Sequence, residues 1–273
     1  MLIGRPSTHY IDRNTRATLR TMAVTKKKLG RITLGVASFI VAAVVASKLV
    51  SYGIQYYQIA TIDKEGMERA LLASNMKLYE VLKKDFPSDY DGLLTSLMNI
   101  LKSGEQGTKL QELAAAENAK IRKKYASLMV SAPDTNLRKL IASSGRFHAA
   151  ILRRDGYQLC NRVVVSGAGA LIGRAGDYIK EIDETAVLVI EALYQGKVNA
   201  VPVADPTDSD WEAVFQKLFE KHPQSYAEVI QNQEIDNPDL CPAFIALMDA
   251  VGSAEGEAGH RVRAALATEM AAS

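Results

Sequence analysis

The segment Ile32–Ala46, ITLGVASFIVAAVVA, contains fifteen residues and no charged side chain. The apolar character resumes after Ser47 and Lys48 and continues to Ile54. A helix needs about 20 predominantly apolar residues to cross the hydrocarbon core of a bilayer. Residues 32–54 supply that length when Lys48 extends its ammonium group to the far interface. We therefore expect a single transmembrane helix over residues 32–54.

Charged and aromatic residues flank this segment. Residues 1–31 hold eight Lys or Arg and one acidic residue, a balance of +7, whereas the rest of the chain has a balance of −5. Positively charged flanks tend to stay in the cytoplasm, and tyrosines favour the headgroup layer. We therefore expect a basic cytoplasmic tail over residues 1–31 and an extracytoplasmic domain held at the cell (inner) membrane. The expected membrane-flanking residues are Lys26, Lys27, Lys28, Arg31, Lys48 and Tyr52.

Two other interpretations of the segment stay open. Translation from Met22 would give a short basic region, an apolar region and the small residues Val44-Val45-Ala46 before Ser47, which is the pattern of a cleaved secretory signal. The other is a buried core helix, which the dense cationic flank disfavours. The anchor and the cleaved signal both place the rest of the chain outside the cytoplasm.

The composition is that of an ordinary globular protein, with 48% hydrophobic and 23% charged residues. The excess positive charge belongs to the basic tail, so it gives no evidence for nucleic-acid binding. The four His and two Cys are scattered along the chain without the spacing of metal ligands. We expect neither a metal nor an organic cofactor.

Apolar residues recur at helical spacing through most of residues 55–251, which predicts an all-α bundle of seven to nine helices. Phe86-Pro87 is an expected helix break, and the Pro-bearing residues 198–206 are an expected extended linker. A capping box from Ser209 to Glu212 is expected to start the helix after that linker. The expected helices cover residues 67–82, 88–101, 108–128, 131–152, 171–193, 209–218, 226–230 and 237–251. Residues 252–273 are rich in Ala, Gly and Glu, which predicts a flexible tail.

Residues 162–173, RVVVSGAGALIG, resemble the nucleotide-binding turn of the short-chain dehydrogenases. In that family a strand leads into glycines whose backbone N–H groups reach a pyrophosphate at a helix N-terminus. The resemblance implies a dinucleotide site at Gly167–Gly173, with Glu191 in the place of a ribose-binding acid.

The chain departs from the family pattern in three ways. Ala170 replaces the middle glycine, no Tyr-x-x-x-Lys follows the turn, and no series of βαβ units surrounds it. The apolar stripe from Leu171 to Leu193 instead favours one long helix ending at Gly196. In that interpretation the small residues Gly167 to Gly176 permit close helix packing, and replacement of Gly169 by a bulky residue would disturb it.

Few residues are candidates for chemistry. His148 falls on the apolar stripe of a helix and has no Cys, Ser or acidic partner nearby in sequence, so we expect a core histidine. A hydrolase would need two carboxylates that converge in a cleft. The candidate acids are Glu112, Glu117, Asp177, Glu181 and Glu184.

The two cysteines, Cys160 and Cys241, lie close to expected helix ends. A single pair in a domain expected to be exported favours one structural disulfide. The alternative is two buried free thiols.

The sequence favours a non-catalytic interaction or scaffold domain of an envelope complex, anchored in the lipid bilayer and bound to protein partners of unknown identity. The alternative is an extracytoplasmic hydrolase acting on cell-wall or lipid material. A minor alternative is a nucleotide-binding protein that uses the Gly167–Gly173 turn.

Overall fold

A computed structural model describes residues 63–272 apart from residues 75 and 104–106, and every regular element in these ranges is a helix. The all-α prediction is thereby confirmed. The expected transmembrane segment, its flanking residues and the basic tail lie outside the described residues and stay predictions. Among the helices that the structure does describe, none has both the length and the apolar character needed to cross a bilayer.

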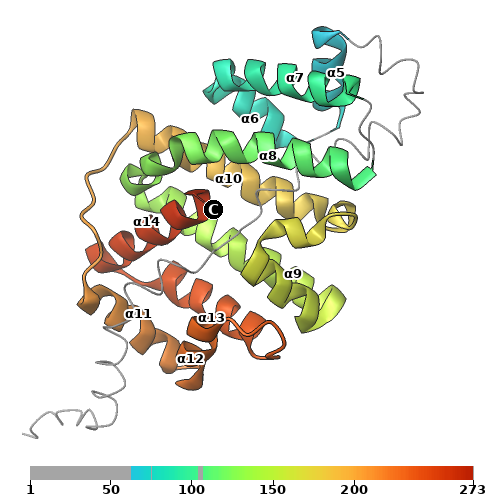
Figure 1. Cartoon of the computed structure of the whole chain (residues 1–273). Helices are drawn as coiled ribbons and strands as arrows, with labels where there is room; N and C mark the ends of the chain where they lie inside the picture. Colours follow the sequence, from blue (N-terminus) through green and yellow to red (C-terminus); the bar gives the residue numbers. More distant parts are fainter. Residues whose placement is uncertain (1–62, 75, 104–106, 273) are drawn as a thin grey trace, which may run out of the picture.

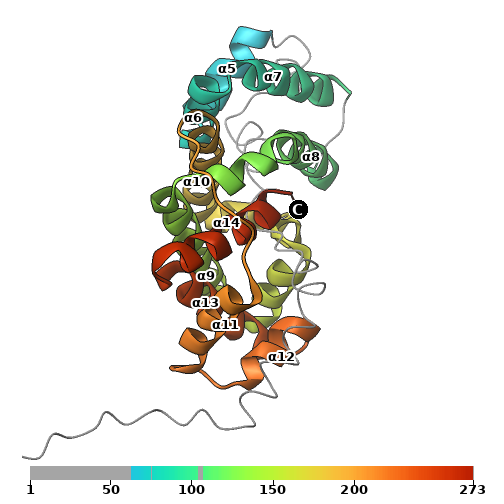
Figure 2. The ribbon, with the colours of Figure 1, turned by 90° about the vertical axis from the view of Figure 1, so that its left-hand side faces the viewer.

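Three helices form a layer at one end of the elongated molecule: α5 (Lys64–Ala73), α6 (Lys77–Asp85) and α7 (Pro87–Lys102) (Figures 1 and 2). The expected break at Phe86-Pro87 is confirmed, because Pro87 occupies the first turn of α7. The expected single helix over residues 67–82 is wrong, because α5 ends at Ala73 and a separate helix, α6, begins at Lys77. The carboxylate of Asp183 accepts the backbone N–H groups of Lys77 and Leu78, each at 3.0 Å, and so caps the new helix from a distant part of the chain.

The middle of the molecule consists of α8 (Gly107–Tyr125), the 3₁₀ turn η1 (Ala126–Ser131), the long α9 (Asp134–Ser166) and α10 (Ile179–Val198). α9 bends at Gly156, where φ is +78°, close to the helix end expected from the sequence. Two short 3₁₀ turns, η2 (Ala168–Leu171) and η3 (Ala175–Tyr178), connect α9 to α10. The expected helix over residues 171–193 is therefore wrong in its first two turns.

The other end is formed by α11 (Asp208–Phe219), α12 (Ser225–Asn232) and α13 (Leu240–Ser253), and α14 (Gly256–Ala272) returns towards α8 (Figure 1). The expected extended linker before α11 is confirmed and runs along the outside of the molecule (Figure 1). α11 starts with a capping box, but Thr207 and Asp210 form it rather than Ser209 and Glu212.

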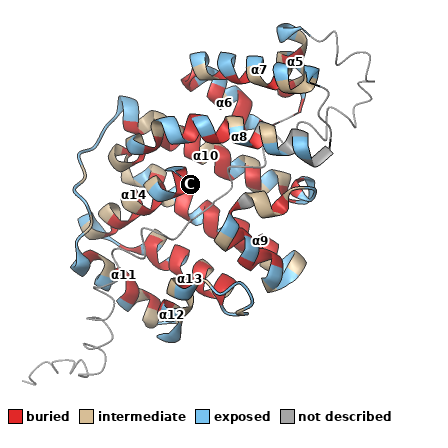
Figure 3. Ribbon diagram, in the orientation of Figure 1, coloured by how far each residue is buried: buried red, intermediate tan, exposed pale blue. Residues whose placement is uncertain are grey.

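The prediction of a flexible tail over residues 252–273 is wrong for the described part of that segment. α14 is a helix whose inner face belongs to the core (Figure 3). The side chain of Arg263 on this helix is 0% exposed. The small residues that suggested disorder instead allow close packing. A Cβ on Gly259 would lie 2.6 Å from the carbonyl oxygen of Ala254, so only glycine fits there.

Candidate functional site

One face of α10 lies open between two neighbouring helices. α6 and α9 both pack against α10 but make little contact with each other, and α10 lies between them in both views (Figures 1 and 2). The resulting depression, which we call the α10 groove, holds about 900 Å³. Its lining residues are Ser74, Met76, Lys77, Arg138, Lys139, Ala142, Arg146, Ile179, Lys180, Asp183, Glu184, Val187, Leu188 and Glu191.

A smaller pocket of about 270 Å³, which we call the extension, lies towards the C-terminal end of α10 and shares Glu191 with the groove. Val81 on α6 and Tyr194 on α10 line this extension. At 1.5 Å per residue, the α10 face from Ile179 to Gln195 is about 24 Å long. The groove and its extension both lie along this face of α10.

The helical period of α10 explains why the groove has an apolar floor. Ile182, Val189 and Leu193 point into the core, whereas Val187 and Leu188 fall on the adjoining face and stay half-buried. Val187 and Leu188, together with Ile179 of α10 and Ala142 of α9, make the groove apolar.

Two of the acids in the groove already have structural partners. Asp183 caps α6, and burial raises the pKa of its carboxyl group although the two backbone hydrogen bonds oppose the shift. Glu184 accepts a hydrogen bond from Arg146 at 2.5 Å across the α9–α10 boundary. Both carboxylates therefore hold helices together.

The basic side chains of the groove are less fully paired. Arg138 binds the carboxylate of Asp134 at 2.7 Å. By contrast, Lys77, Lys139 and Lys180 make no ion pair with any carboxylate in the described part of the chain. These three lysines line the groove and not its extension.

The candidate acids of a hydrolase do not gather in this groove. Of the five, only Glu184 lines it. Glu112 and Glu117 lie on α8, where they pair with Lys109 at 3.4 Å and Lys120 at 2.5 Å. Asp177 lies in η3 and pairs with Arg174 at 3.5 Å. Within the described ranges, no group of three or more His, Cys, Asp or Glu could hold a metal ion.

The glycine-rich segment lacks the structural context of a nucleotide-binding turn. Residues 162–165 belong to α9, so a helix takes the place of the strand that the turn requires. Gly167 and Gly173 adopt φ values of +74° and +84°, which explains glycine at these two positions.

The expected close packing at Gly169 is wrong, because a Cβ there would meet nothing within 4 Å. Close approach occurs instead at Gly196, where a Cβ would overlap the carbonyl oxygen of Leu128 in η1.

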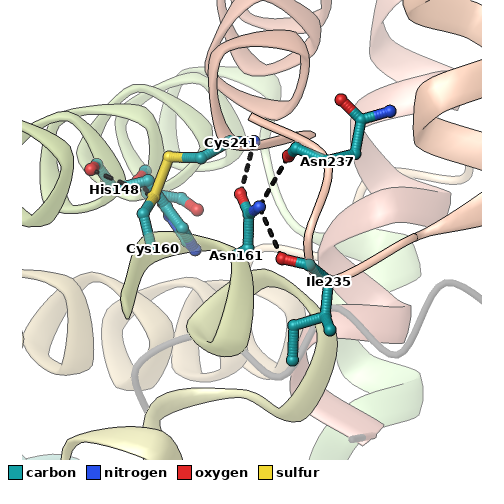
Figure 4. The surroundings of a disulfide bond; sticks show 7 residues. His148, Cys160, Asn161, Ile235, Asn237 and Cys241 are labelled. Atoms are coloured by element: carbon teal, nitrogen blue, oxygen red, sulfur yellow. Dashed lines mark hydrogen bonds between the residues drawn. A yellow bond between two sulfur atoms is a disulfide. The ribbon is translucent and has the colours of Figure 1, made fainter. Parts of the chain in front are cut away.

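The two cysteines lie at disulfide-bonding distance, with their Cα atoms 5.8 Å apart, and the predicted pair is confirmed (Figure 4). Asn161 lies beside them. Its side-chain oxygen accepts the backbone N–H of Cys241 at 2.9 Å, and its amide donates to the carbonyls of Ile235 and Asn237 at 2.8 and 2.7 Å (Figure 4). This fully buried asparagine fixes the start of α13 next to the disulfide.

His148 is a core residue, as expected. Its side chain is 1% exposed, packs against Phe244 at a ring-centroid distance of 4.6 Å, and bonds the carbonyl of Ser144 through Nδ1 at 2.8 Å. Burial lowers its pKa from 6.5 to about 4, although the Ser144 bond opposes the shift. The imidazole is therefore neutral at physiological pH.

Comparison of the chain with protein-family models, with curated proteins and with solved structures gives no match. Function must therefore be argued from the geometry. Sequence reasoning missed the α10 groove, because its lining comes from three helices that are about 30 to 100 residues apart in the sequence. The only local signal is that the face of α9 carrying Lys139, Ala142 and Arg146 is polar or small.

Proposed function

We propose that this protein is a non-catalytic interaction domain, anchored to the membrane by residues 32–54 and facing an oxidising extracytoplasmic compartment, where it takes part in an envelope complex. The observation that carries the proposal is the α10 groove. It combines an apolar floor with a charged rim, and Asp183 and Glu184 in that rim serve to hold helices. A surface of this kind suits the binding of another molecule better than acid–base chemistry.

The paired cysteines support the proposed location in an oxidising extracytoplasmic compartment. Stable disulfides persist in secreted and periplasmic proteins and are rare where thiols are kept reduced. The charge balance of the flanks supports the orientation.

Co-purification from native membranes tests the proposal. Ala142 is an exposed alanine on α9 that lines the groove, and Ala213 is an exposed alanine on α11 remote from it. We expect the full chain to bring down a defined set of proteins, Ala142→Trp to lose them and Ala213→Trp to keep them. Equal retention by both folded variants would contradict a role for the groove, and purification without any stoichiometric partner would contradict the interaction domain itself.

A further inference from the structure

We propose that the occupant of the α10 groove is an amphipathic helix of a partner protein whose apolar stripe is flanked by acidic residues. This inference rests on the proposed interaction function and specifies its partner. Three observations lead to it: the shape of the groove, the charges along it and the charge of this chain's own N-terminal segment.

The shape fits a helix. α10 forms the floor, and α6 and α9 lie on either side with little contact between them. The axes of helices that pack on one another lie 8–10 Å apart. The open face from Ile179 to Gln195 is about 24 Å long, which matches about 16 residues of a docked helix. Amphipathic helices bind grooves in this way through residues at i, i+3, i+4 and i+7.

The charges indicate which side chains the docked helix carries. Lys77, Lys139 and Lys180 line the groove on α6, α9 and α10 and lack ion-pair partners among the described residues. Acidic side chains on the docked helix therefore meet unpaired positive charge on each of the three helices that form the groove.

The same charges argue against two other occupants. Residues 1–31 of this chain carry a balance of +7, so the lysines repel this segment. A single acyl chain would leave the polar groups that recur along the rim, such as the Arg146–Glu184 and Lys84–Asp85 pairs, facing hydrocarbon. A helix with polar flanks keeps these groups in water or in contact with charged partners.

Site-specific photo-crosslinking in native membranes tests the inference. The probe p-benzoylphenylalanine replaces Val187 on the groove floor of the full-length protein, and the same probe replaces Gln216, an exposed residue on α11, as a control. We expect one protein adduct at position 187 and none at position 216. Sequencing of the crosslinked peptide should show apolar residues at helical spacing with Glu or Asp beside them.

Charge reversal provides the second readout. We expect Lys139→Glu with Lys180→Glu to reduce the adduct about tenfold, because each exposed ion pair contributes only a modest amount and reversal adds repulsion. Lys123→Glu with Lys221→Glu, two exposed lysines outside the groove, is the matched control and should leave the adduct unchanged.

Each other outcome overturns the inference. A lipid adduct assigns the groove to an amphiphile, and an intramolecular adduct to residues 1–62 assigns it to this chain. A basic crosslinked peptide, an equal loss in both double variants, or no adduct at position 187 also contradicts it. If partners co-purify but crosslink only at position 216, the proposed interaction function is kept and the inference about the α10 groove is rejected. When nothing co-purifies or crosslinks, both fail.

Discussion

Replacement of Arg263 by methionine should cost this protein a large part of its stability. Arg263 is 0% exposed and lies in α14, in the segment that composition alone marks as a flexible tail. Its Nε donates to the carboxylate of Asp134 at 2.7 Å, and Nη1 donates to the carbonyls of Val251 and Ala254 at 2.8 and 2.7 Å. These carbonyls end α13, so one guanidinium joins three helices.

The magnitude follows from which groups lose their partner. Arg138 also binds Asp134 and Ala254, so these two keep one bond each, whereas Val251 loses its charged donor. A hydrogen bond to a charged group contributes about 1.5–3 kcal/mol. Asp134 is partly exposed and keeps Arg138, so it is not left as an unpaired buried charge. Methionine fills most of the volume, so the cavity is small. We expect Arg263→Met to lower the free energy of unfolding by about 3 kcal/mol.

Denaturant titration of the full chain in detergent micelles measures this effect. Trp211 is the single tryptophan and lies on α11, which packs against α13 and α14, so its fluorescence reports on this region. Arg162→Met is the control, because Arg162 is exposed on α9, and a surface change of this kind should alter stability by less than about 0.5 kcal/mol. A loss below about 1 kcal/mol for Arg263→Met would refute the reasoning and return α14 to a loosely held tail.

Three further predictions use other parts of the core. Gly196→Ala should destabilise the fold by at least about 2 kcal/mol, because its Cβ would overlap a backbone carbonyl of η1. Gly169→Ala is the control and should leave stability unchanged, because a Cβ there meets open space. Equal thermal unfolding midpoints for the two variants would contradict this prediction. Removing the disulfide by changing Cys160 and Cys241 to Ala should cost about 4–5 kcal/mol for the 81-residue separation, less any loss of residual structure in the unfolded chain. Because burial lowers the pKa of His148 to about 4, the unfolded state takes up a proton first as the pH falls below 6.5. Stability should then decline by up to about 1.4 kcal/mol per pH unit between pH 6.5 and 4, and His148→Phe should remove this slope; an unchanged slope would assign it to other groups.

The elements that the sequence predicts well are those set by local chemistry. Phe86-Pro87 ends one helix and starts the next, and the Pro-bearing linker before α11 is extended, because proline restricts the backbone wherever it occurs. The disulfide is predicted because the chain has two cysteines and the domain is expected to be exported. His148 follows from its place on an apolar stripe.

The elements that the sequence does not predict depend on distant partners. No local signal divides residues 67–82, because the cap that starts α6 is Asp183 on another helix. The composition of α14 is that of a tail, and only the bonds of Arg263 to Asp134 and to the end of α13 show why it folds. The α10 groove is harder still to foresee, because it is the space left between helices rather than a property of any one of them.

The cap on α6 has a consequence for biosynthesis. Lys77 and Leu78 leave the ribosome 106 and 105 residues ahead of Asp183, their hydrogen-bond acceptor. At about 5–20 residues per second, roughly 5–20 s pass before that acceptor is made. The delay is longer for Arg122 on α8, because the carbonyls of Met270 and Ala271 that it binds lie 148 and 149 residues later in the chain. The face of the nascent N-terminal layer that packs against α10 is therefore uncovered for several seconds during synthesis, and during that interval it is open to aggregation.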